Sequence, residues 1–104
     1  MKLREHPALL SIKLTTWPPV WVCAEQFKRS MQGEIGVLKE VKRRDLRGRH
    51  FFVHVEHDQF NFMGCLMFDD PAICEQVFNL LKSCLGRAIK EIGDMEVDGL
   101  LPNP

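Results

Sequence analysis

The sequence predicts an α+β fold: an antiparallel sheet of four to five strands with two helices, in the order βαβββα(β). Aromatic and β-branched residues crowd into 51–68, which is typical of a β-hairpin. The segment 69–86 has a helical apolar stripe that begins and ends with capping residues. The chain has 104 residues, 45% of them apolar and 27% charged, which fits one compact domain over 1–104.

A strand and a helix are expected before residue 34. Apolar and polar residues alternate from Ala8 to Thr15, as in a strand with one buried face. Two prolines, Pro18 and Pro19, end this strand because proline cannot donate to a sheet ladder. An apolar stripe at helical spacing then predicts a helix that ends near Gly33, and its members are Val20, Cys23, Ala24, Phe27 and Met31.

The segment 35–42 fits two patterns. Ile35, Leu38 and Val41 have helical spacing, whereas Ile35, Val37 and Val41 suit a strand. Gly36 favours the strand, because glycine weakens a helix interior. The polar, charged segment 42–49 is the expected exposed connection.

The hairpin over 51–68 is interrupted at 57–59, and its register depends on the parity of the loop. An even loop gives one strongly apolar face, whereas an odd loop mixes apolar and polar positions. We expect an even loop, with Gly64 on the packed face. That face then carries Phe51, Val53, Val55, Phe60, Phe62, Leu66 and Phe68.

A second helix follows the hairpin. Asp69 and Asp70 supply an acidic cap, Pro71 suits the first helical turn, and Gly86 marks the end. We expect an apolar stripe formed by Ile73, Val77, Leu80, Leu81 and Cys84. The segment 88–97 is either a further helical turn or a last strand, and 101–104 is expected to be a flexible tail.

The charge is divided between the two halves of the chain, although 14 basic and 14 acidic residues balance overall. Residues 1–55 hold 11 basic and 5 acidic side chains (+6), and residues 56–104 hold 3 basic and 9 acidic ones (−6). The two halves should therefore attract each other, with their charges on solvated faces. The alternative is a bipolar surface that steers a partner or a second copy.

The sequence favours a cytoplasmic protein. It has no apolar run long enough to cross a bilayer, and its first residues lack the core of a signal peptide. The cysteines are too few and too irregularly spaced for a disulfide framework, so we expect reduced thiols at Cys23, Cys65, Cys74 and Cys84.

Reactive residues give only weak candidates for chemistry. His54, His57 and Cys65 suggest a zinc or thiol site, but residues 54 and 57 point to opposite faces of a regular strand. Cys65 has apolar neighbours, which disfavour a thiolate. Capping already explains Asp69 and Asp70, and His6 and His50 are expected to be exposed. We therefore expect no cofactor, no metal and no catalytic residue.

Basic residues cluster within 11 positions and raise the alternative of nucleic-acid binding. Glu40 and Asp45 interrupt the cluster, and no aromatic residue lies between its members to stack on bases. A solvated loop is the simpler interpretation. The cluster consists of Lys39, Lys42, Arg43, Arg44, Arg47 and Arg49.

The second side of the hairpin carries the main functional hypothesis. It is unusually apolar for a solvent-facing surface, and methionine-rich patches adapt to partners or small apolar ligands. We expect a non-catalytic binding or regulatory module that forms a homodimer through this side. The alternative is a rolled sheet with both faces in one core. The residues are Phe52, His54, Met63, Cys65 and Met67.

Overall fold

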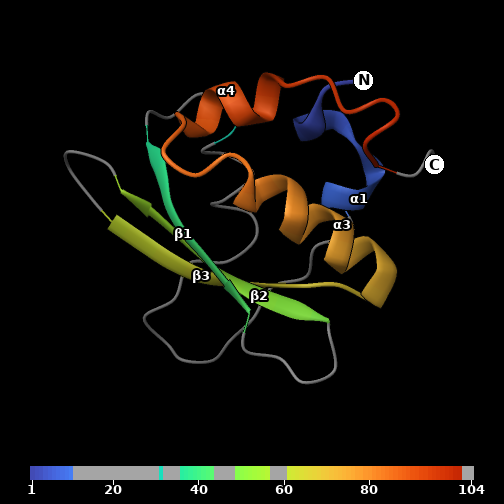
Figure 1. Cartoon of the computed structure of the whole chain (residues 1–104), viewed down its shortest axis with the longest axis horizontal. Coiled ribbons are helices and arrows are strands. Elements are labelled where there is room, and N and C mark those ends of the chain that lie inside the picture. The colour runs from blue at the N-terminus through green and yellow to red at the C-terminus, as the bar shows by residue number, and fades with distance from the viewer. Residues whose placement is uncertain (11–30, 32–35, 44–48, 57–60, 102–104) are drawn as a thin grey trace.

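The computed structural model describes residues 1–10, 31, 36–43, 49–56 and 61–101, without the side chains of residues 8, 10 and 61–63. Its strands form one antiparallel sheet in the order β1-β2-β3, with helices gathered on one side (Figure 1). The elements are η1 (Leu3–Glu5), α1 (Pro7–Leu10), β1 (Val37–Arg43), β2 (His50–Glu56), β3 (Asn61–Met67), α3 (Pro71–Lys82) and α4 (Ile89–Asp94).

The α+β class is as predicted, but the described residues contain three strands, so the expected four or five and their full order are not confirmed. No helix in the described ranges is long and apolar enough to cross a membrane. The predicted helix over 20–31 lies outside the described residues except for Met31, which is helical and buried.

The expectation of a strand beginning at Ala8 is wrong for residues 8–10, which belong to the short helix α1. Pro7 is the first residue of α1, a position where its missing N–H costs nothing. Leu9 is buried, although strict alternation would have turned it away from the core. Residues 11–15 of the predicted strand lie outside the described residues.

Strand β1 contains a bulge that explains its ambiguous sequence. Its pairing with β2 shifts between Leu38 and Glu40, which leaves Lys39 as the extra residue. Leu38 and Val41 are both buried, although they are three positions apart. A regular strand would place them on opposite faces, so the bulge produces a helix-like spacing within a strand.

The hairpin has the predicted even register. Glu56 pairs with Asn61, so an even number of residues separates the paired strands, and Phe51 pairs with Leu66. Gly64 is buried opposite Val53, as expected for the packed face. The Phe51 ring stacks on that of Phe68 at 5.7 Å and meets that of Phe78 edge-on at 5.4 Å.

Helix α3 begins as predicted. The Asp70 side chain accepts a hydrogen bond from the backbone N–H of Ala72 at 2.9 Å, and Pro71 opens the helix. The helix ends at Lys82, and Gly86 takes a positive φ of 85° in the turn that follows. The buried residues differ in part from the expected stripe: Cys74, Val77, Phe78 and Leu81.

The segment 88–97 forms a helix rather than a strand over most of its length. Its α4 covers Ile89–Asp94 and follows a short stretch that runs along the free edge of β1. There the Leu38 N–H donates to the Arg87 carbonyl at 3.1 Å, and the Gly86 N–H donates to the Leu38 carbonyl at 2.8 Å. This stretch covers the β1 edge without being a full strand.

The C-terminal residues return to the core and to the N-terminus. Leu101 is buried in the main hydrophobic cluster, so the expected flexible tail cannot begin at residue 101. The Leu3 N–H donates to the Met95 carbonyl at 2.9 Å, and the Val97 N–H donates to the Met1 carbonyl at 3.0 Å. We call this contact between residues 1–4 and 94–98 the terminal junction.

Candidate functional site

The outer face is the side of the β2–β3 hairpin that points away from the packed core. Phe51, Val53 and Val55 are buried, so the alternate residues of β2 belong to the other side. Directly paired residues of an antiparallel sheet share a face, which extends the outer face into β3. The cross-strand pairs on this face are His50–Met67, Phe52–Cys65, His54–Met63 and Glu56–Asn61.

Burial is uneven across the outer face. Met67 is 37% exposed, whereas Phe52 and His54 are half-buried. Cys65 belongs to the predicted interface but is only 5% exposed, so its thiol is already covered within one copy. Met63 is placed by its register alone, because its side chain is not among those described. Among the side chains described on this face, the exposed apolar area is at the Met67 end.

Strand β1 adds a polar margin to the outer face. Glu40 pairs with His54 and Lys42 pairs with Phe52, and both β1 side chains are exposed. The margin therefore carries one negative and one positive charge, two residues apart on the same strand. An apolar centre with a charged margin resembles the general anatomy of protein–protein interfaces.

The positions of the described residues do not bring together the candidate metal or thiol site. The register sets Cys65 opposite Phe52 and not opposite His54. His57 lies outside the described residues. Within the described ranges, no group of three or more histidine, cysteine or acidic residues is arranged to hold a metal ion. Asp70 serves as the helix cap, as predicted.

Two of the four histidines were expected to be exposed, and the structure corrects both. His6 is 3% exposed, in the turn between η1 and α1, where its carbonyl accepts from the Leu9 N–H. His50 is half-buried in β2, with its ring edge-on to Phe52 at 6.1 Å. The burial of His6 and of His50 depends on packing in the folded chain, which the neighbouring sequence does not predict.

The predicted basic cluster is divided among different environments. Lys39 and Lys42 are exposed on β1, and Arg49 is exposed before β2. The Arg43 guanidinium forms an ion pair with Glu75 and lies 4.4 Å from the centre of the Phe78 ring. Arg43 is thus engaged within the fold. Two further members, Arg44 and Arg47, lie outside the described residues.

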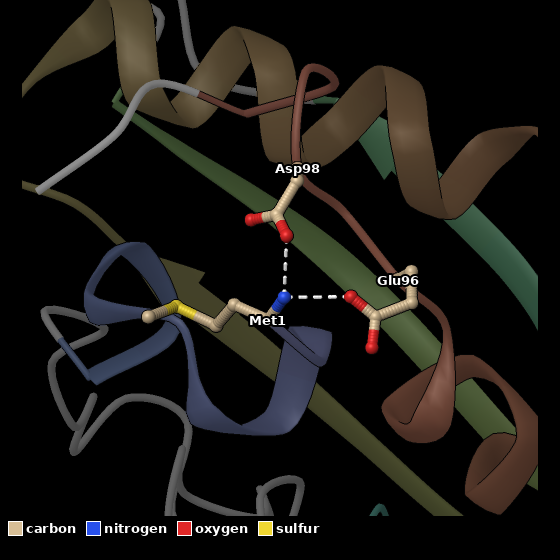
Figure 2. A network of polar contacts seen from close by, with 3 residues as sticks. All are labelled: Met1, Glu96 and Asp98. Carbon is tan, nitrogen blue, oxygen red and sulfur yellow. Dashed lines mark hydrogen bonds and ion pairs between the residues drawn. The ribbon is translucent and has the colours of Figure 1, made fainter.

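The terminal junction holds a cluster that sequence reasoning missed. The Met1 ammonium lies 2.6 Å from a carboxylate oxygen of Glu96 and 2.6 Å from one of Asp98, as Figure 2 shows. Hydrogen bonds to Asp98 and then to Glu96 raise the pKa of this ammonium above its usual value. The only sequence feature that pointed to this cluster was the basic first half and acidic second half of the chain. That division of charge did not predict which residues form ion pairs.

Comparison with protein-family models, with curated proteins and with solved structures gives no match for this chain. Any functional argument therefore rests on the residues themselves. The strongest local features are the outer face near Met67 and the ion-paired ammonium of Met1.

Proposed function

We propose that the chain is a small non-catalytic binding module that forms a homodimer through the outer face. The observation that carries this proposal is the 37% exposure of Met67 beside a half-buried Phe52. Large apolar side chains that remain accessible next to aromatic ones are typical of association surfaces. A second copy of this chain would cover Met67 and remove apolar area from water.

Charge favours a second copy as the partner. All seven residues of β3 are uncharged, so two β3 strands can approach without like-charge repulsion. On the margin, Glu40 and Lys42 have opposite charges. In a two-fold interface residue i meets j′ and residue j meets i′, so Glu40 of one copy can meet Lys42 of the other twice.

Cysteines without disulfide bonds fit a reducing compartment, and we propose the cytoplasm as the location of the module. Cys65, Cys74 and Cys84 are all buried and unbridged. Cys74 and Cys84 belong to the main hydrophobic cluster, and buried thiols of this kind behave as small packing residues, which supports a binding role over a thiol-dependent reaction.

Light scattering across a range of protein concentrations tests the proposal. The unaltered chain should reach twice its monomer mass, and Met67→Lys should shift the midpoint of association to at least about tenfold higher concentration. Leu85→Lys is the matched control, because Leu85 is 42% exposed in the turn after α3 and lies outside the outer face. A chain that stays monomeric at the highest concentration contradicts the proposal.

A charge swap tests the two-fold arrangement. Glu40→Lys should weaken association because two lysines then face each other across the interface. The double variant Glu40→Lys/Lys42→Glu should restore it, since the opposite charges meet again. Equal weakening in the single and double variants would exclude this pairing of the margins.

A further inference from the structure

We draw no further inference here: the strongest candidate, the edge of the uncharged strand β3 that faces away from β2, carries nothing, because among the described residues nothing shows what covers that edge.

Discussion

The β2–β3 hairpin and the terminal junction differ in the sequence separation of the residues that form them. In the hairpin, residues that pair are close in sequence, and the period-2 pattern of apolar side chains determines which face is buried. In the junction, Met1 and Lys2 meet Glu96 and Asp98 from the opposite end of the chain. The hairpin can therefore be predicted locally, whereas the junction depends on contacts between residues that are far apart in the sequence.

Phe51→Ala tests the hairpin side of this comparison and should have the largest effect. Phe51 is completely buried and its ring contacts those of Phe68 and Phe78, so truncation leaves a large cavity. We expect a loss of about 3–5 kcal/mol in the free energy of unfolding, measured in urea. Phe52→Ala is the control, since Phe52 is half-buried on the outer face and should lose clearly less. A reversed order would mean that the register is wrong.

Leu38→Ala tests whether the β1 bulge turns Leu38 into the core. Leu38 is completely buried, and we expect a loss of about 2–4 kcal/mol. Lys39→Ala is the matched control, because the bulged Lys39 is exposed and should change stability by less than about 0.5 kcal/mol. Similar losses in both variants would show that Leu38 does not face the core.

The hairpin and the segment around β1 also show which features can be predicted from the sequence alone. The even loop, the Gly64 position and the Asp70 cap were predicted because each depends on residues that are near in sequence. The ambiguity at 35–42 had a physical source, since a bulge gives a strand the spacing of a helix.

The wrong predictions concern residues whose burial or secondary structure depends on tertiary packing. The alternation over 8–15 predicts a strand, yet residues 8–10 belong to the short helix α1 and Leu9 is buried, so the local pattern does not decide the structure of this segment. His6, at 3% exposure, and Leu101, at 4%, are buried, although the local sequence predicts an exposed histidine and a flexible tail. On the predicted outer face, Met67 is exposed whereas Cys65 is buried. Both positions belong to the same alternating pattern, so the pattern alone could not predict this difference in exposure.

Gly93→Ala tests the packing behind the terminal junction. A Cβ atom at Gly93 would lie 2.7 Å from both the Cβ and the carbonyl oxygen of Met31, so the backbone must shift. We expect a net loss of about 1–2 kcal/mol by urea unfolding, because the clash exceeds the gain in helix propensity. Lys90→Ala, at an exposed position of the same helix, should be nearly neutral. A stabilised Gly93→Ala would contradict this close approach.

The pH dependence of the junction should be the smallest effect. The pKa of the Met1 ammonium is raised in the folded chain by hydrogen bonds to Asp98 and Glu96, so folding favours its protonated form. Its contribution is therefore complete below the unfolded pKa of about 8 and is lost as the pH rises through the folded pKa. In thermal unfolding, the melting temperature of the unaltered chain should fall more between pH 7 and 10 than that of Glu96→Gln/Asp98→Asn. Parallel curves would mean that the ammonium contributes nothing to folding. The hairpin variants Phe51→Ala and Phe52→Ala should keep the pH dependence of the unaltered chain, because neither substitution changes a group that bonds to Met1.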